Sequence, residues 1–289
     1  MPHRHRTRAV AAGAVTALAL LVGLSAVHQV RHERDVGQRR AEAAQAVNTL
    51  RTRLEEELHA RLYLTDALAA YVKAHPELTD AAFMELARLL TGKHTAIRSL
   101  QLARDTVISH VYPRRGNEAA VGLHLLELRA QREPVARALR LRDTVVAGPV
   151  DLVQGGTAFI ARTPILVPRG GSELRYWGLA SVVIDMEGLF QAANLWRWSR
   201  HLRLAIQGSD SKGPAGQVFF GEGSVFRADP VETTVRLPNG SWRLAAVPEN
   251  GWSPRSVHDV EFWLFGALLT AAGGVLVGLL VYRPEQLAE

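Results

Sequence analysis

The chain has 289 residues, of which 47% are hydrophobic, and it contains no cysteine. The absence of cysteine excludes a small scaffold held together by disulfide bonds, so an exported domain of this chain must fold through its hydrophobic core. A formal net charge of +6 raises the question of nucleic-acid binding, but the arginines are scattered along the chain. We interpret the excess charge as a solvated surface and expect no nucleic-acid partner.

Two uncharged apolar runs lie near the ends of the chain, at residues 9–27 and 262–282. In helical conformation they would extend about 28 and 32 Å, close to the hydrocarbon thickness of a bilayer. Both are therefore predicted to be transmembrane helices. A cleaved signal peptide is the alternative for the first run, because a basic head (residues 1–8) precedes it and Ser25-Ala26 offers small residues near a cleavage point.

The arginine distribution predicts the orientation. Arg4, Arg6 and Arg8 favour a cytoplasmic amino terminus, although further arginines just beyond the first run dilute this bias. The second span then returns residues 283–289 to the cytoplasm, where they resemble the start of a connector. We expect an inner-membrane protein whose residues between the spans are periplasmic.

A long amphipathic helix is predicted to continue out of the first span. Residues 36–72 lack proline, and their apolar residues recur mostly at intervals of three or four. A shorter helix follows, with Thr79 as its N-cap and Gly92 at its end. We assign residues 28–95 to this helical stalk. Its membrane-near part has little sequence to cover its apolar stripe, which favours a homodimer contact.

Strand signals and short helices alternate over the rest of the exposed part, which favours an α+β fold. Residues 208–216 are predicted to form a loop, and Asn239-Gly240 predicts a hairpin turn. The predicted strands are 100–102, 107–112, 145–150, 157–166, 176–184, 202–207, 217–220, 231–237 and 241–247, and the predicted helices are 117–128, 134–141 and 186–195.

Five short motifs lie between residues 104 and 185, and together they suggest a family. They are Val-Tyr-Pro at 111–113, Gly-Asn-Glu at 116–118, Ala-Gly-Pro-Val at 147–150, Gln-Gly-Gly at 154–156 and Tyr-Trp-Gly at 176–178. In this order, and between two apolar spans, they resemble the CHASE family of extracytoplasmic sensory domains. The resemblance implies a long helix followed by two PAS-like modules, with residues 96–195 far from the membrane and residues 196–258 near it.

The resemblance also implies a ligand pocket in the module formed by residues 96–195. Carried over position by position, it points to His124, Val146, Gly155 and Gly156. Related plant receptors have an acidic side chain at the position of His124 and a hydroxyl near Gly155. Because this chain departs at both positions, we do not expect it to bind the same purine hormone.

Tyr112 and Arg162 are further candidates for ligand binding. Each also has a structural interpretation. Tyr112 could simply close a strand, and Arg162 could form an ion pair with Glu118 or Asp185.

The second apolar run carries small residues at intervals of four. Such a stripe allows two helix backbones to approach closely, so we expect the second span to pack on another helix along it. The stripe consists of Gly266, Thr270, Gly274 and Gly278.

No familiar catalytic signature is present. The sequence lacks a Gly-x-Ser-x-Gly elbow, a phosphate-binding loop and a His-Glu-x-x-His helix, so we predict neither an enzyme nor a metal or other cofactor. The predicted function is that of a sensor in a two-component or similar system. It would bind a small molecule and signal through the second span to a cytoplasmic kinase or cyclic-nucleotide output. The alternative is an envelope adaptor that binds no ligand.

Overall fold

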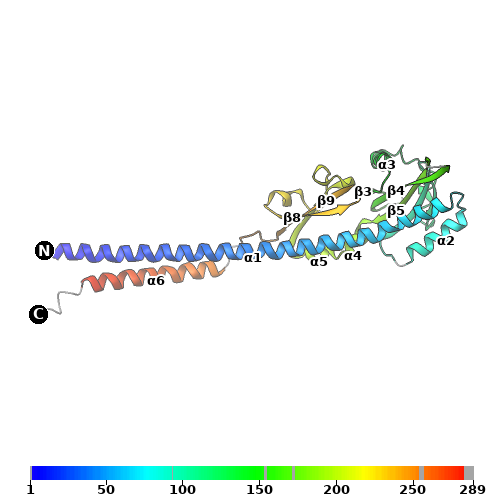
Figure 1. Cartoon of the computed structure of the whole chain (residues 1–289). Helices are drawn as coiled ribbons and strands as arrows, with labels where there is room; N and C mark the ends of the chain where they lie inside the picture. The colour runs from blue at the N-terminus through cyan, green and yellow to red at the C-terminus, as the bar shows by residue number, and fades with distance from the viewer. Residues whose placement is uncertain (1, 93, 153–154, 171–172, 254–256, 283–289) are drawn as a thin grey trace. The chain divides into compact units, whose positions relative to one another are not determined.

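The computed structural model describes residues 2–92, 94–152, 155–170, 173–253 and 257–282. The chain divides into two compact units (Figure 1). The first contains Met1–Ala41 and Asn250–Glu289, and the second contains Glu42–Glu249. Helix α1, Pro2–Ala74, contributes to both units.

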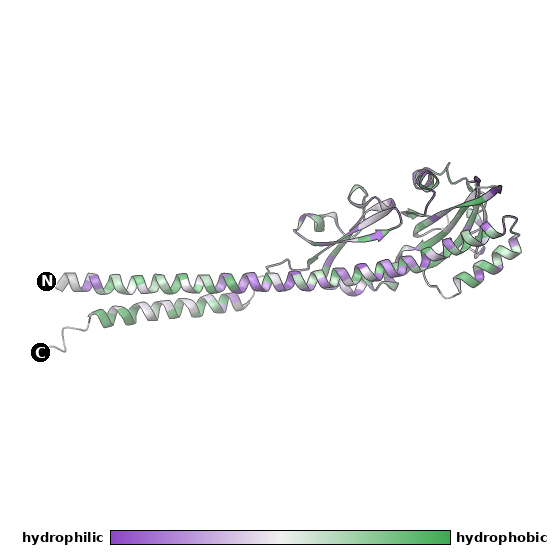
Figure 2. Cartoon of the chain, in the orientation of Figure 1, coloured by the Kyte–Doolittle hydropathy of each residue, from purple (hydrophilic) through white to green (hydrophobic). Residues whose placement is uncertain are grey.

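Apolar helices dominate the first unit, which consists of the first part of α1 and of α6, Val257–Tyr282. In Figure 2 green dominates α6 and the stretch of α1 that contains residues 9–27, whereas purple residues flank that stretch of α1 on both sides. Both are long and apolar enough to cross a membrane, by length and composition. The two predicted spans therefore lie on helices that meet the physical requirement for spanning.

The small-residue stripe of α6 lies toward α1 of the same chain. A methyl group added to Gly274 would lie 3.0 Å from the carbonyl oxygen of Gly13, and one added to Gly278 would lie 3.5 Å from that of Ala9. A methyl group added to Gly266 would contact Leu24 at 3.2 Å. The hydroxyl of Thr270 donates within its own helix, to the carbonyl of Gly266.

Residues 42–74 of α1 form the long helix of the second unit, on which both of its sheets pack. One face of this segment is buried throughout, with Leu50, Leu54, Leu58 and Leu68 fully inaccessible to solvent. The buried Arg61 belongs to the same region, and its guanidinium donates to the carbonyls of Thr95 and Glu57 and to the Glu57 carboxylate. The predicted long helix is thus confirmed, and its apolar stripe contacts its own domain.

Helix α2, Asp80–Thr91, has the caps that the sequence predicts. The Thr79 side chain accepts a hydrogen bond from the amide of Ala82 at 3.3 Å, and Gly92 is the C-cap residue. Phe83 on its inner face is fully buried.

A five-stranded antiparallel sheet follows, with strand order β2-β1-β5-β4-β3. One of its faces lies against α1, where the hydroxyl of Thr163 donates to that of Thr65 at 2.8 Å and is paired with that of Thr144 at 2.7 Å. All five strands were predicted, but β1, β4 and β5 are longer than expected. The strands are β1 (Ile97–Arg104), β2 (Val107–Tyr112), β3 (Val145–Asp151), β4 (Thr157–Gly170) and β5 (Glu173–Asp185).

The prediction of a helix at residues 117–128 is wrong. Only the three-residue 3₁₀ helix η1, Glu118–Ala120, forms there, and residues 122–125 run alongside the start of β2. The amide of Ile108 donates to the carbonyl of Leu123, and the amide of Leu125 donates to the carbonyl of Thr106. These bonds satisfy the backbone in extended form, so a helix is not needed.

The next helix is also longer than predicted. Helix α3, Arg129–Leu141, begins five residues before the expected start and contains Pro134 in its interior.

The predicted single helix at residues 186–195 is divided into α4, Met186–Ala192, and α5, Leu195–Trp198. Asn194 between them adopts a left-handed conformation, which interrupts the helical path.

A second antiparallel sheet has strand order β7-β6-β9-β8. Its strands are β6 (Leu202–Gln207), β7 (Val218–Phe220), β8 (Val231–Leu237) and β9 (Gly240–Pro248). The connection before β7 contains the 3₁₀ turns η2 (Ser209–Ser211) and η3 (Gly213–Ala215), and η4 (Gly223–Arg227) follows β7. The β8–β9 turn lies one residue earlier than predicted. Leu237 pairs with Gly240, so Pro238 and Asn239 form the turn, with Asn239 at a φ of 55°.

An aromatic cluster joins the two sheets. Phe159 of β4 lies 4.6 Å from Trp242 of β9 and 5.5 Å from Phe219 of β7, measured between ring centroids. Phe190 of α4 completes the cluster at 6.3 Å from Phe159. The α+β prediction, with two PAS-like sheets behind a long helix and a long apolar helix after them, is confirmed by this architecture.

Gly178 of β5 provides a test of the sheet packing, because a methyl group there would overlap the backbone carbonyl of Ala103 on β1. We expect Gly178→Ala to lower the free energy of unfolding by about 1–3 kcal/mol, since overpacking would force the two strands apart. Gly223→Ala is the control, because its added methyl group would meet only Val218, at 3.9 Å. Thermal unfolding of the detergent-solubilised chain would measure both, and equal stability of the two variants would contradict the close strand approach.

Candidate ligand-binding site

The five-stranded sheet bears a cavity of about 210 Å³ on the face opposite α1. We call it the sheet cavity. Residues 120–131 cover the strands there, and the loop after β3 contributes its edge. Its lining residues are Gln101, Ile108, Ala120, Leu123, Leu125, Leu128, Arg129, Ala130, Gln131, Asp151, Leu152, Ile160, Arg162 and Val183.

A row of polar side chains crosses the middle of the sheet at this cavity. Gln101 of β1 pairs with Ser181 of β5, and Ser181 pairs with Arg162 of β4. Directly opposed residues of neighbouring strands project from the same face, so the three side chains share one face of the sheet. All three are buried. A buried polar row within an apolar sheet is costly unless its groups find partners.

Arg162 is the chemically distinctive member of this row. Its side chain is only 2% exposed, and its Nη2 donates to Oε1 of Gln131 on α3. Its Nε and Nη1 have no hydrogen-bond partner among the residues that the structure describes. Burial lowers the pKa of Arg162 from 12.5 to about 10, and the Asp210 carboxylate opposes this shift. The guanidinium therefore remains charged at neutral pH, with unused donors.

Apolar side chains form most of the remaining wall. Ile160 and Val183 pair across β4 and β5 beside the polar row, and both are buried. Leu123 and Leu125 line another part of the wall, where they pack with Ile108, whereas Leu152 packs against Ile160 and Val183. A cavity with apolar walls and a few convergent polar groups is the usual form of a small-molecule site.

Of the six residues predicted to bind ligand, Arg162 lines the cavity. It contacts Gln131, whereas the sequence suggested Glu118 or Asp185 as its structural partner. His124 is 54% exposed, and its Nδ1 lies 3.7 Å from the Glu127 carboxylate. His124 forms an isolated antiparallel bridge with Val107, and its neighbours Leu123 and Leu125 line the cavity whereas His124 does not.

The other four predicted residues, on β2, on β3 and in the loop after β3, do not line this cavity. Val146 is buried and pairs with Ala161, while its carbonyl accepts a hydrogen bond from the Ser211 hydroxyl. Tyr112 ends β2 and pairs with Leu100. Gly155 and Gly156 both have positive φ angles in the loop between β3 and β4.

Sequence reasoning missed Gln131, which accepts a hydrogen bond from Arg162, and Gln101, which lines the cavity with it. Gln101 and Gln131 lie far apart in the sequence and belong to no motif, so only the strand register and the position of α3 bring them together. Alternation along β1 could have placed Ser99 and Gln101 on one face of the strand and Leu100 and Leu102 on the other.

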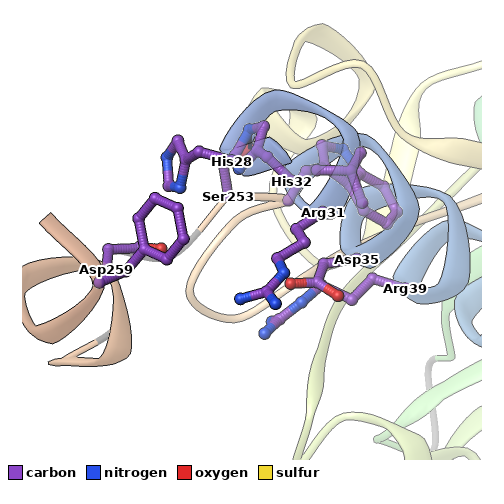
Figure 3. A pocket seen from close by; sticks show the side chains of 10 residues that line it. His28, Arg31, His32, Asp35, Arg39, Ser253 and Asp259 are labelled. Atoms are coloured by element: carbon purple, nitrogen blue, oxygen red, sulfur yellow. Dashed lines mark hydrogen bonds between the residues drawn. The ribbon is translucent and has the colours of Figure 1, made fainter. Parts of the chain in front are cut away.

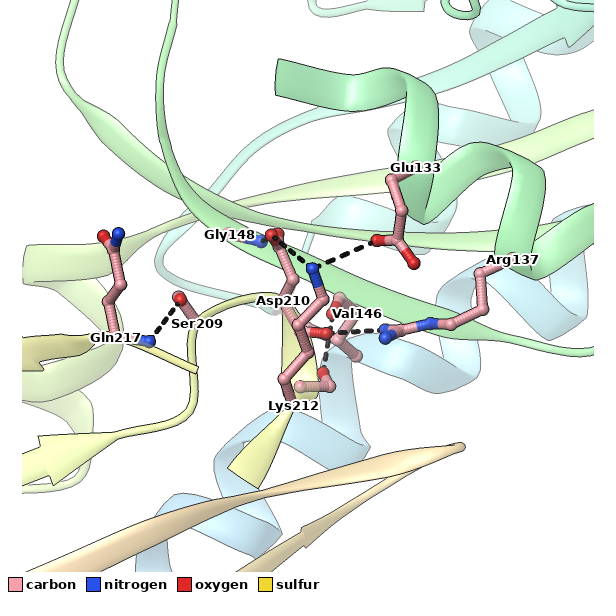
Figure 4. A network of polar contacts seen from close by, with 9 residues as sticks. Glu133, Arg137, Val146, Gly148, Ser209, Asp210, Lys212 and Gln217 are labelled. Atoms are coloured by element: carbon pink, nitrogen blue, oxygen red, sulfur yellow. Dashed lines mark hydrogen bonds and ion pairs between the residues drawn. The ribbon is translucent and has the colours of Figure 1, made fainter. Parts of the chain in front are cut away.

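Polar contacts connect the sheet cavity to the second sheet (Figure 4). The Asp210 carboxylate accepts a hydrogen bond from the amide of Gly148 on β3 at 2.8 Å, and its carbonyl accepts one from Arg137 of α3 at 2.6 Å. Lys212 lies 3.4 Å from the Glu133 carboxylate, also on α3. Helix α3 thus contributes to the cavity through Gln131 and to the contact between the sheets through Glu133 and Arg137.

A second cavity, of about 250 Å³, lies within the first unit between α1 and the start of α6 (Figure 3). His28 and His32 stack on one another, and the ring of Phe262 packs on His28 with centroids 5.4 Å apart. Arg31 lies over Phe262 at 5.6 Å. Among the described residues, no group of three histidine, cysteine or acidic side chains could hold a metal ion. This cavity lacks a buried polar anchor comparable to Arg162.

Two antiparallel sheets behind a long helix, a cavity on one sheet, and two helices long and apolar enough to cross a membrane are features of extracytoplasmic ligand-binding domains of receptors. The family model of the CHASE domain matches residues 38–220, which is more than half of the chain. The chain therefore belongs to the CHASE domain family. No catalytic domain is identified by this comparison, and a search of curated proteins gave no match.

Solved structures of sensor domains share the fold at low sequence identity. The periplasmic sensory domain of the Campylobacter jejuni chemoreceptor Tlp1 aligns with a TM-score of 0.55 and 9% identity, over 75% of this chain and 98% of that one. The ligand-binding domain of the Pseudomonas aeruginosa amino acid chemoreceptor PctC, in complex with GABA, gives 0.51 and 14%, over 70% and 96%.

An extracellular ligand binding receptor from Desulfohalobium retbaense DSM5692 aligns with a TM-score of 0.50 and 13% identity. The match covers 71% of this chain but only 38% of that receptor. At these identities the likeness is one of fold.

Two buried arginines allow a structural role to be separated from a binding role. Arg61 has protein acceptors, so we expect Arg61→Met to lower the free energy of unfolding by about 1–3 kcal/mol by leaving the Thr95 carbonyl without its partner. Arg162→Met removes a desolvated charge that lacks an ion-pair partner among the described residues, and Gln131 is only half-buried and can reach water. Its free energy of unfolding should therefore stay unchanged or rise.

Thermal unfolding of the purified chain in the absence of added ligand would compare the two variants. Equal destabilisation by Arg61→Met and Arg162→Met would show that Arg162 serves the fold in the same way as Arg61.

Proposed function

We propose that this chain is the input region of an inner-membrane receptor, and that a small molecule bound in the sheet cavity changes the signal that leaves through α6. The observation that carries the proposal is the buried guanidinium of Arg162, which keeps unused donors inside an apolar cavity. Protein folds rarely retain such a group without a partner. The ligand bound in PctC, GABA, supports a ligand of this size class.

Two sets of contacts could carry a conformational change from the cavity to the rest of the domain. On one side Thr163, adjacent to Arg162 in β4, is hydrogen-bonded to Thr65 of α1. On the other side α3 connects Gln131 to the Asp210 contact with the second sheet. Since α1 and the chain after β9 lead to the two apolar helices, a shift of β4 or α3 can bias both helices that enter the membrane.

Signal output requires a further component. The proposed receptor is a homodimer whose α6 couples to a kinase or to an enzyme of cyclic-nucleotide signalling, either in a continuation of the chain or in a partner protein. The population-shift mechanism needs a ligand that favours one arrangement of α1 and α6 over another. A ligand that bound both arrangements equally tightly would leave the signal unchanged.

A screen of water-soluble metabolites by thermal shift of the detergent-solubilised chain tests the proposal. A ligand at a concentration of about 100 times its Kd adds about 2.7 kcal/mol to the free energy of unfolding. We expect Leu123→Trp to abolish this stabilisation, because the half-buried Leu123 lines the cavity and an indole there would fill it. Leu174→Trp, on the exposed end of β5, should respond like the wild type.

If a stabilising metabolite were found and Leu123→Trp responded to it normally, the ligand would bind elsewhere. Unchanged stability across the whole screen, in the presence of an intact fold, would count against the sensor role.

Reporter fusions test the proposed membrane topology. The proposal places both termini in the cytoplasm and the residues between α1 and α6 outside, because the basic residues at positions 4, 6 and 8 favour the cytoplasmic side. A periplasm-active reporter should therefore work when fused after Arg40 or His258, and a cytoplasm-active one when fused after Glu289. Cytoplasmic activity at Arg40, or cleavage of the mature chain after Ala26, would contradict this topology.

A further inference from the structure

The charge inside the sheet cavity restricts the chemistry of its ligand. We infer that the cavity binds a small organic monocarboxylate, with the carboxylate on Arg162 and Gln131 and the remainder of the molecule against the apolar wall. This inference rests on the proposed function, since it names the ligand class of the same site.

The first step is the charge balance at Arg162. The guanidinium is buried, and its Nη2 contacts the neutral amide of Gln131. Among the described residues no carboxylate accepts a hydrogen bond from it, and Nε and Nη1 have no partner. A neutral ligand could accept hydrogen bonds from the unused donors of Arg162 but would leave its positive charge unbalanced. An anionic ligand would supply both the hydrogen-bond acceptors and the opposite charge. Arginine and carboxylate are also matched in their planar geometry.

The nearest acidic influence, Asp210, has other partners. Its Oδ1 accepts the amide hydrogen of Gly148 at 2.8 Å, and its Oδ2 lies 3.8 Å from the ammonium of Lys212. It opposes the effect of burial on Arg162, but no hydrogen bond joins its oxygens to the guanidinium among the described residues. The cavity side of Arg162 therefore remains the side on which an anion can bind.

Gln131 adds a second polar contact with a defined direction. Its Oε1 accepts from Arg162, so its side-chain NH₂ remains a donor at the same position. A carboxylate can accept from both residues at once. A hydroxyl could accept from both residues but would not supply the missing negative charge, and an ammonium has no lone pair with which to accept.

The rest of the cavity sets the size and polarity of the ligand. At about 210 Å³ it is below the range typical for drug-sized ligands, about 300–1,000 Å³. Ile108, Leu125, Ile160 and Val183 give it an apolar wall that would not solvate a second charge. The lining also includes Asp151 and the exposed Arg129, whose opposite charges offset each other and leave one positive charge, that of Arg162, for a ligand to balance. These features favour a single carboxylate on a short, mainly apolar body.

The test uses the full chain in detergent and a matched series of probes. Acetate, propionate, butyrate, valerate, hexanoate and benzoate are compared with the corresponding primary amides, with sodium chloride holding the ionic strength constant. We expect at least one of the longer carboxylates to raise the Tm in a saturable manner, while its amide raises it at most a tenth as effectively at equal concentration.

Two variants locate the binding. Arg162→Met should lose the carboxylate response. Gln131→Glu should also lose it, because the new carboxylate would itself pair with Arg162, and this variant should have a raised Tm without any probe. The folded Gln131→Glu protein thus keeps the test decisive even if Arg162→Met were to unfold.

The inference is overturned if no carboxylate in the series raises the Tm, if the amides act equally, or if the response persists in Gln131→Glu. A neutral metabolite that stabilises the wild type and Arg162→Met but not Leu123→Trp would overturn the carboxylate assignment and leave the sensor function standing. Absence of any stabilising compound, in this series and in the metabolite screen, would overturn both.

Discussion

Burial of the apolar face of α1 is the constraint on which the rest of the second unit depends. Leu50, Leu54 and Leu58 are fully inaccessible to solvent, and complete burial of a leucine side chain contributes about 1.5–3 kcal/mol. The same segment binds the second sheet, where Glu55 accepts the amide hydrogen of Arg236, and the first sheet, where Thr65 bonds to Thr163. Because one helix holds both sheets, neither can move without changing contacts on α1.

This arrangement places the cavity and α1 on opposite faces of one sheet. Arg162 and Thr163 are consecutive in β4, so their side chains project to opposite faces. The face with Arg162 is open to a ligand, and the face with Thr163 is bonded to α1. In the proposed mechanism a displacement of β4 by less than the length of a hydrogen bond would alter the threonine contact. Close-packed sheets transmit such displacements because they deform little.

The sequence predicted most of the fold because strands and helices differ in the period of their apolar residues. Strand signals located all nine strands, and capping at Thr79 identified the start of α2. The segment 117–128 was mistaken for a helix because its hydrogen-bond partners lie on β2, which local preference does not show. That error also misplaced His124, whose neighbours Leu123 and Leu125 line the cavity whereas His124 does not. Arg162 was found as a candidate, but its partner Gln131 carried no signal in the sequence.

The two buried arginines show why burial alone does not identify a site. Arg61 and Arg162 are equally inaccessible, but Arg61 has a carboxylate and two carbonyls as acceptors, whereas Arg162 has a single amide acceptor among the residues that the structure describes. A native domain is stable by only about 5–15 kcal/mol, so a desolvated charge without a counter-ion is a considerable cost to retain. Such a cost is understandable when an external anion provides the missing charge. An anion would then bind most strongly at the buried charge that the unliganded fold leaves without a counter-ion. The free energy of binding gained at Arg162 would be available to shift β4 and α3.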